Sequence, residues 1–253
     1  MSKFTKATAI ALAAGLGLAA TVGIAPAQSA PKTLVVATEG TYAPFTYHSG
    51  SKLVGYDVEL FTAVAAKAGY KVKWQETTWD GIFAGLESKR WDAIANQVTI
   101  RADRQAKYDL TNPYTVSNYV AVTRKDDTRV KAVSDIKGLK SAQSATSSFA
   151  DEAKKYGANI ETVEGFTQAI ALLQLGRVDV TLNDSLAVLD YIKNNRDANV
   201  KVAATFGDPS KQGFVFRKNS GLLAAFNKAL AALTKNGTVA KLGKKYFGQD
   251  VSK

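Results

Sequence analysis

Hydrophobic residues along the chain alternate between two patterns. Short runs of β-branched residues, such as 32–38 (Lys-Thr-Leu-Val-Val-Ala-Thr), are typical of buried strands. Between them, apolar residues recur at helical spacing, as at Leu60, Phe61 and Val64, and Gly69 ends that helix. This alternation predicts an α/β protein. Further strands are expected at 71–74, 93–95, 119–123, 159–163, 178–182, 200–206 and 214–217, and further helices at about 79–86, 133–139, 149–156, 166–175, 185–193, 222–234 and 238–246.

One stretch of the pattern occurs twice. Residues 86–96 and 173–183 share leucine, arginine, aspartate and asparagine at identical spacings, and Trp79 and Phe166 occupy equivalent positions upstream. Each copy predicts a helix, a tight Arg-x-Asp turn and a buried strand that ends in an amide. An offset of 87 residues is too long for a solenoid repeat. It indicates two similar α/β lobes whose strand ends would enclose a cleft.

The first 30 residues predict a segment that is removed from the mature protein. Lys3 and Lys6 precede an apolar run at 7–20, and Ala25-Pro26-Ala27 supplies small residues for cleavage. This is typical of a secretory signal peptide, which we place at 1–27, with a cut after Ala30 as the second choice. The run is too short for a membrane span, so we expect a soluble, exported chain.

The amino-acid composition narrows the class of protein further. The chain has no cysteine, which excludes disulfides and a lipid-anchored cysteine, so we expect a periplasmic protein without a lipid anchor. His48 is the single histidine and is expected in an exposed turn, so neither a metal site nor a Ser-His-Asp triad is predicted. Without Lys3 and Lys6 the net charge is +9, but the lysines are scattered and no nucleic-acid face is expected.

The segment 90–104 predicts half of a ligand site. Its strand runs into polar residues, Asn96, Gln97 and Thr99, at the kind of strand end where open α/β sheets bind ligands. Arg104 follows, and its guanidinium matches a carboxylate bidentately. The alternative is a polar loop followed by a surface arginine.

Other strand and helix ends complete the predicted site. Glu39 and Tyr42 follow the first strand. Three hydroxyls, Thr146, Ser147 and Ser148, stand at a helix N-terminus, where they form an anion site or simply cap the helix. Asp184 is open to two interpretations: it is a buried carboxylate that pairs with a ligand cation, or it caps the next helix. Asp57 and Glu59 are interpreted as acids that complement a helix N-terminus rather than as an acid–base pair.

Several motifs together resemble the bacterial extracellular solute-binding proteins of family 3, the amino-acid receptors of ABC importers. Within this family, Glu39-Gly-Thr-Tyr42, Trp79-Asp-Gly and 96–100 are most similar to the cystine-binding branch. The segment 146–148 departs from the commoner Gly-Thr-Thr form. The matching motifs are Gly-Tyr-Asp-Val-Glu-Leu at 55–60, Gly-Thr-Tyr-Ala-Pro-Phe at 40–45, Trp79-Asp80-Gly81, 90–104, Asn112-Pro113-Tyr114, 140–149, 177–184 and Lys-Lys-Tyr-Phe-Gly at 244–248.

The resemblance implies a type II periplasmic-binding-protein fold. Each lobe would be a mixed sheet flanked by helices, with two crossing hinge segments near 115–121 and 207–213. We place lobe 1 at 31–117 plus 211–253, and lobe 2 at 118–210. A monomer is expected that binds a free amino acid in the cleft, closes over it, delivers it to a membrane permease and needs no cofactor.

Within that fold the ligand-binding roles can be assigned. Arg104, Thr99 and Ser147 or Ser148 would hold the α-carboxylate, and Asp184 with the Gln97 region would hold the α-ammonium. Tyr42 and Trp79 would supply walls. Glu39 would then contact the far end of the ligand side chain, which favours ligands with a distal ammonium. Cystine is therefore the first choice of ligand, before other polar or basic amino acids. The alternatives are an exported, dehydratase-like enzyme with Glu39 or Asp184 as general acid, and a sensor domain, which would require a transmembrane or fused module.

Overall fold

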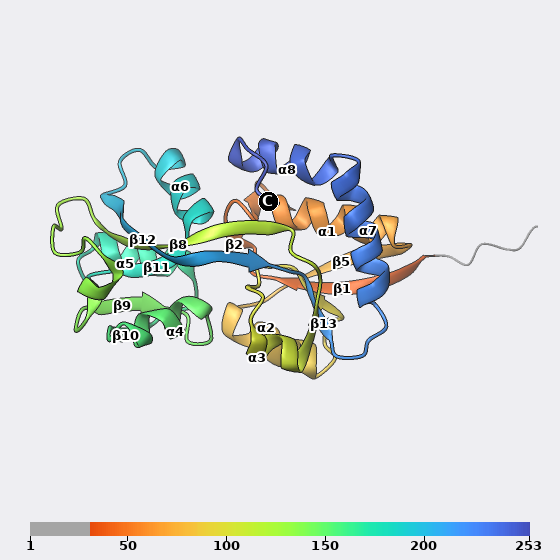
Figure 1. Cartoon of the computed structure of the whole chain (residues 1–253), viewed down its shortest axis with the longest axis horizontal. Helices are drawn as coiled ribbons and strands as arrows, with labels where there is room; N and C mark the ends of the chain where they lie inside the picture. Colours follow the sequence, from red (N-terminus) through yellow and green to blue (C-terminus); the bar gives the residue numbers. More distant parts are fainter. Residues whose placement is uncertain (1–30) are drawn as a thin grey trace, which may run out of the picture. The chain divides into compact units, whose positions relative to one another are not determined.

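The structure is a computed structural model that describes residues 31–253, and the predicted signal peptide lies outside the described residues. The described part is a mixed α/β fold of two lobes joined by two long strands (Figure 1). Among the described residues, no helix is long and apolar enough to cross a membrane.

The first lobe is built on a five-stranded mixed sheet in the order β5-β1-β6-β13-β7. β1 pairs in parallel with β5 and β6, and β13 pairs antiparallel with β6 and β7. The strands are β1 (Lys32–Thr38), β5 (Tyr70–Glu76), β6 (Ala93–Ile94), β7 (Tyr108–Leu110) and β13 (Val215–Arg217), with a hairpin of β2 (Thr41–Tyr42), β3 (Thr46–Ser49) and β4 (Lys52–Val54).

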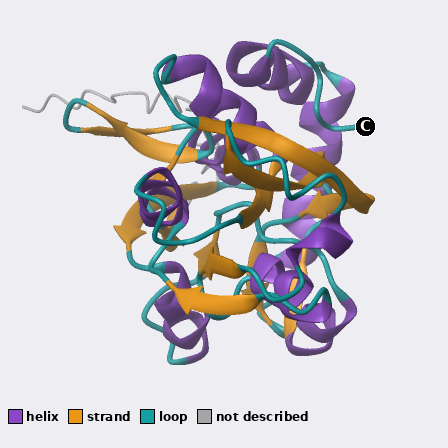
Figure 2. Ribbon diagram, turned by 90° about the vertical axis from the view of Figure 1, so that its left-hand side faces the viewer, coloured by secondary structure: helices purple, strands orange, loops and turns teal. Residues whose placement is uncertain are grey.

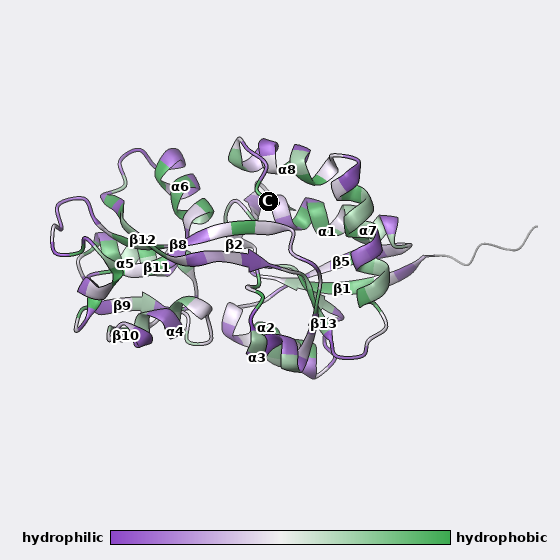
Figure 3. Ribbon diagram, viewed as in Figure 1, coloured by the Kyte–Doolittle hydropathy of each residue, from purple (hydrophilic) through white to green (hydrophobic). Residues whose placement is uncertain are grey.

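Alternation along the strands divides the core of this lobe into two layers. Leu34 and Val36 pack on the side of α1, α7 and α8, whereas Ala37 packs on the side of α2. Figure 3 shows hydrophobic residues along β1 and β13, between these helix layers. The helices are α1 (Tyr56–Lys67), α2 (Trp79–Glu87), α3 (Ala102–Lys107), α7 (Leu223–Lys235) and α8 (Thr238–Phe247).

The second lobe contains a three-stranded antiparallel sheet and a two-stranded parallel sheet, covered by helices (Figure 2). A bridge between Ser141 and Val180 links the two sheets. The strands are β8 (Thr115–Arg124), β9 (Lys140–Gln143), β10 (Asn159–Thr162), β11 (Thr181–Asp184) and β12 (Val200–Gln212), and the helices are η1 (Val133–Ile136), α4 (Ser148–Lys155), α5 (Phe166–Gln174) and α6 (Ser185–Asn194).

The two crossings between the lobes are the long strands β8 and β12, which pair antiparallel from Arg124↔Val200 to Thr115↔Gln212. Their register is interrupted between Phe206 and Ser210. The predicted α/β fold of two lobes with two crossing segments is confirmed by this architecture.

The duplicated sequence pattern corresponds to duplicated structure. Asp92 accepts a hydrogen bond from the backbone N–H of Val35 (3.0 Å), and Asp179 accepts one from that of Lys140 (3.0 Å). In each copy the aspartate after the helix therefore bonds to the backbone of another strand, in the middle of β1 and at the start of β9. The copies differ at the next element, because β11 begins at Thr181 rather than at 178 and pairs antiparallel with β8.

Candidate functional site

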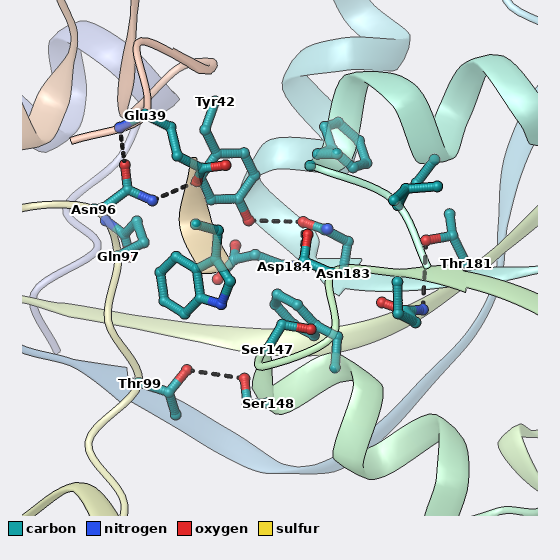
Figure 4. A pocket seen from close by; sticks show the side chains of 18 of the residues that line it. Glu39, Tyr42, Asn96, Gln97, Thr99, Ser147, Ser148, Thr181, Asn183 and Asp184 are labelled. Atoms are coloured by element: carbon teal, nitrogen blue, oxygen red, sulfur yellow. Dashed lines mark hydrogen bonds between the residues drawn. The ribbon is translucent and has the colours of Figure 1, made fainter. Parts of the chain in front are cut away.

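A cavity lies between the two lobes, with Glu39 and Asn96 on the side of the first lobe and Thr181 and Asp184 on that of the second (Figure 4). Its space not filled by atoms is about 590 Å³, the open mouth included. Nine of the eleven predicted site residues line it: Glu39, Tyr42, Trp79, Asn96, Gln97, Thr99, Ser147, Ser148 and Asp184. The other lining residues are Ala142, Gln143, Ser144, Phe149, Val163, Gly165, Phe166, Ala169, Thr181, Asn183 and Gln212.

The wall from the first lobe is organised by Asn96, at the end of β6. Its Oδ1 accepts hydrogen bonds from the backbone N–H of Glu39 (2.8 Å) and from Thr38 Oγ1 (3.1 Å), and its Nδ2 donates to Glu39 Oε2 (2.5 Å). Burial of the carboxyl raises the pKa of Glu39 to about 7. Within the described part of the chain, no basic side chain forms a salt bridge with Glu39, so this acid can accept a cation from a ligand.

The backbone at Gln97 has a left-handed conformation, with φ of 50°, and the fully buried Asp57 holds it there. The Asp57 carboxylate accepts from Gln97 N (2.7 Å), Gln97 Nε2 (2.9 Å) and Tyr114 Oη (2.8 Å). Its pKa is raised to about 7 by burial. Asp57 lies in the first turn of α1, as predicted, and its buried carboxylate also supports a cavity wall through Gln97.

Asp184 ends β11 and is both a helix cap and a cavity residue. Its Oδ1 accepts from the backbone N–H of Leu186 (2.8 Å), and its Oδ2 accepts from Ser117 Oγ. Burial raises the pKa of Asp184 to about 6. Asp184 therefore caps α6, as one of the two interpretations predicted. No basic side chain among residues 31–253 forms a salt bridge with this buried carboxylate.

Two further acceptors line the same cavity. The side-chain carbonyl oxygens of Gln97 and Gln212 are buried and have no hydrogen-bond partner among the described residues. Buried carbonyl oxygens are normally satisfied, and a ligand N–H would satisfy them. Gln212 was not predicted as a site residue, because only the pairing of β12 with β8 brings it to the cavity.

The predicted carboxylate side is formed by Thr99 and the N-terminus of α4. Thr99 Oγ1 lies 3.3 Å from Ser148 Oγ, across the two lobes. Ser147 caps α4 by accepting from the backbone N–H of Ala150 (3.1 Å). Ser147 only accepts in this cap, so its O–H and that of Ser148 both remain able to donate to a ligand carboxylate.

Arg104 lies beside this cavity and does not line it. It is 5% exposed, and its guanidinium is 5.4 Å from the ring centre of Trp79 and 5.3 Å from that of Phe83. Nη1 donates to the backbone oxygen of Thr99 (3.1 Å). Arg104 and Thr146 line an adjacent hollow instead. The structure therefore separates these two predicted residues from the other nine, although Arg104 stays joined to the cavity through Thr99 and Trp79.

Aromatic side chains close the cavity from both lobes. Tyr42 Oη donates to Asn183 Oδ1 (2.7 Å), and the rings of Tyr42 and Phe166 meet edge to face at 6.0 Å. Asn183 and Phe166 were not among the predicted site residues. The duplicated pattern contained the signal for both, since it pairs Asn183 with Asn96 and Phe166 with Trp79.

The lobes also touch outside the cavity. Asp80 at the start of α2 accepts from Thr146 N (3.0 Å), Thr146 Oγ1 (2.7 Å) and Ala145 N (3.3 Å). Arg101 bridges to Asp151 at 2.7 Å. These contacts join the first lobe directly to the start of α4 in the second lobe, outside the cavity.

A family model and a curated relative both match most of this chain. A model of the bacterial extracellular solute-binding proteins, family 3, matches residues 34–249. The L-cystine-binding protein TcyA of Bacillus subtilis (strain 168) is 51% identical over 223 residues, which are 87% of this chain and 83% of that protein.

Two solved structures differ in how well they superimpose. An ancestral arginine-binding protein with bound arginine is 34% identical and has a TM-score of 0.82, over 87% of this chain and 100% of the other. The L-cystine solute receptor of Neisseria gonorrhoeae in its unliganded open conformation is 45% identical but has a TM-score of 0.59, over 88% and 96% of the two chains. The structure is thus more similar to the ligand-bound relative, in agreement with the contacts that join its lobes.

Proposed function

Because the chain belongs to the bacterial extracellular solute-binding proteins of family 3, we propose that it is the receptor of an amino-acid ABC importer. It binds a free amino acid between its lobes and delivers it to a membrane permease. The observation that carries this proposal is the interlobe cavity, in which buried acceptors without cationic partners, Asp184 and the carbonyl oxygens of Gln97 and Gln212, surround a space open to a ligand ammonium.

The lobes and hinge follow from the same proposal. We place lobe 1 at 31–117 plus 211–253 and lobe 2 at 118–210, with hinge segments near 115–121 and 207–213. These segments coincide with the ends of β8 and β12 that pair between the lobes. The receptor acts as a periplasmic monomer without a lipid anchor, and hinge motion opens and closes the cavity.

The roles of the cavity residues are assigned by charge. Asp184, Gln97 and Gln212 hold the α-ammonium, and Ser148 and Thr99 donate to the α-carboxylate. Arg104 supplies the positive charge for this carboxylate, either directly after a side-chain rotation past Trp79 or through Thr99. Ser147 positions the α4 N-terminus, and Thr146 joins the lobes through Asp80 rather than touching the ligand.

Cystine is the proposed ligand. Glu39 is the second cavity carboxylate without a basic partner, and a distal ammonium would pair with it. Arginine and other basic amino acids share this feature and follow as alternative ligands. The 51% identity to an L-cystine-binding protein supports cystine over them.

Binding proceeds without chemical conversion. The relatives that match the chain at high identity are binding proteins, and the enzyme alternative would require Glu39 or Asp184 to act as a general acid. A receptor returns its ligand unchanged. Recovery of intact cystine after prolonged incubation with the protein is therefore the expected result.

Calorimetric titration of the wild type and Glu39→Gln with cystine, arginine and glutamine tests the ligand. We expect cystine to bind the wild type most tightly, and Glu39→Gln to weaken cystine by at least tenfold while glutamine changes by less than threefold. Glu76→Gln is the matched control, because Glu76 pairs with His48 outside the cavity. Preference of the wild type for glutamine would refute the cystine assignment, and absence of binding to any amino acid would refute the receptor.

A further inference from the structure

Nearly all of the net positive charge of the described chain lies at its C-terminal end. Residues 211–253 contain nine basic residues and one acidic residue, Asp250, a net charge of +8. Residues 31–210 contain 22 basic and 21 acidic residues, a net charge of +1. Although lysines occur throughout the sequence, the net charge is therefore distributed very unevenly between these two parts of the chain.

The structure places much of this charge on two consecutive helices of the first lobe. Their inner sides are buried in the core through Phe226, Leu230, Leu233 and Val239. Their outer sides carry Lys228 and Lys235 on α7 and Lys241 and Lys244 on α8, all exposed. We call these four lysines the basic face. None of them forms a salt bridge with an acid among the described residues, whereas the neighbouring Lys245 bonds to Glu59 (2.6 Å). Figure 3 shows hydrophilic segments on both helices.

An edge strand extends the positive charge beyond the helices. β5 is the outermost strand of the five-stranded sheet, and Lys71 and Lys73 are exposed on it. The ring of Tyr70, at the start of β5, lies 5.9 Å from that of Phe226 on α7, so this strand begins beside the basic face. Lysines on an edge strand also discourage strand pairing with another chain.

The chemistry of the face distinguishes among possible partners. Protein interfaces are enriched in arginine and aromatic residues and depleted in lysine. The large exposed hydrophobic side chains of the described residues are Leu175 and Leu189, both in the second lobe. Single-stranded nucleic acids are bound by stacking on aromatic side chains, which this face lacks. Lysine ammonium groups are mobile point charges, and a group of them suits a surface of anionic headgroups.

We propose that the basic face binds anionic phospholipid headgroups and holds the receptor at a membrane surface through charge alone. The attraction acts within about a Debye length of the surface, roughly 8 Å at physiological ionic strength, and therefore depends on salt. None of the four lysines lines the interlobe cavity, so membrane association leaves the ligand site accessible. The receptor would then search for its permease along a surface instead of through the whole compartment.

Vesicle co-sedimentation of the full mature chain tests this proposal. Vesicles of phosphatidylcholine alone are compared with vesicles that contain about 30% phosphatidylglycerol, at about 50 and 500 mM salt. The test variant is Lys228→Gln/Lys235→Gln/Lys241→Gln/Lys244→Gln. The control variant is Lys131→Gln/Lys137→Gln/Lys154→Gln/Lys193→Gln, which removes the same charge from exposed positions of the second lobe.

We expect the wild type to bind only the anionic vesicles, with at least a tenfold loss at high salt. Each lysine at the membrane surface contributes about fivefold, so removing four corresponds to a loss of up to roughly 600-fold. We expect the test variant to bind at least tenfold more weakly while the control stays within threefold of the wild type. Absence of binding to anionic vesicles, or an equal loss in both variants, would overturn the proposal. Amino-acid binding should be unchanged in both variants, so this experiment and the test of the receptor function can fail separately.

Discussion

Ligand binding should release close to one proton from the protein at about pH 6.5. The pKa of Glu39 is raised to about 7 and that of Asp184 to about 6 by burial. At this pH roughly three quarters of the Glu39 carboxyls and one quarter of the Asp184 carboxyls carry a proton. An ammonium group stabilises only the ionised carboxylate, so both protons must leave when a diamino ligand binds.

The sign of the pH dependence follows from this release. Because the free protein binds more protons than the complex, affinity falls as pH falls. Between pH 7 and pH 5 the loss is roughly tenfold from Asp184 and roughly fiftyfold from Glu39, as each must be deprotonated before it pairs. A ligand with a neutral side chain engages only Asp184 and should show the smaller of these two effects.

Calorimetry in buffers of different ionisation enthalpy measures the released protons directly. The observed binding enthalpy, plotted against buffer ionisation enthalpy, has a slope equal to the number of protons exchanged. We expect a slope near one proton for arginine or cystine with the wild type, and about one quarter with Glu39→Gln. A slope of zero in the wild type, or one that Glu39→Gln leaves unchanged, would refute the assignment of these carboxylates as ammonium partners.

Two further substitutions test the surroundings of the cavity. Arg104→Ala should weaken the binding of every amino-acid ligand by about 2–5 kcal/mol, since it removes the charge partner of the ligand carboxylate. The control is Arg90→Ala, which removes an exposed arginine that stacks on Trp91. If Arg104→Ala binds within twofold of the wild type, Arg104 does not hold the carboxylate. Asp80→Asn weakens the link to Thr146, so we expect about threefold to tenfold weaker ligand binding and a larger radius of gyration of the free protein in solution scattering. Glu152→Gln, which alters an exposed pair within α4, should change neither quantity. An unchanged radius for Asp80→Asn would show that its contacts do not hold the lobes together.

Elements with a clear apolar pattern were predicted well from the sequence, and short polar ones were not. β1 and α1 agree with expectation almost to the residue, because β-branched runs and helical spacing reflect burial directly. α3 was missed, since Ala-Asp-Arg-Gln-Ala-Lys has no apolar face, although it carries Arg104. β8 and β12 are longer than predicted because pairing between them, rather than hydrophobicity, extends both strands between the lobes.

The candidate site was predicted where its residues follow strands and missed where only tertiary structure collects them. Asn96 and Asp184 were recognisable as polar residues at buried strand ends. Asp57 was correctly placed at a helix start, but its contact with Gln97 was not foreseen, since the helix start offered a sufficient local reason for an acid. Gln212 gave no signal, because its role depends on a partner strand nearly 100 residues away in the chain, at Thr115.

The paired crossing strands determine the mechanics of opening. Three residues of β12, from Gly207 to Pro209, stand opposite the single residue Asn118 of β8, between the pairs Phe206↔Tyr119 and Ser210↔Ser117. Gly207 has φ of 67°, and Pro209 has no N–H to donate. Bending at this interruption disturbs the ladder less than bending where the two strands pair in register. Hinge motion should therefore be concentrated in the few backbone dihedrals of residues 207–209, which turn the second lobe as a unit.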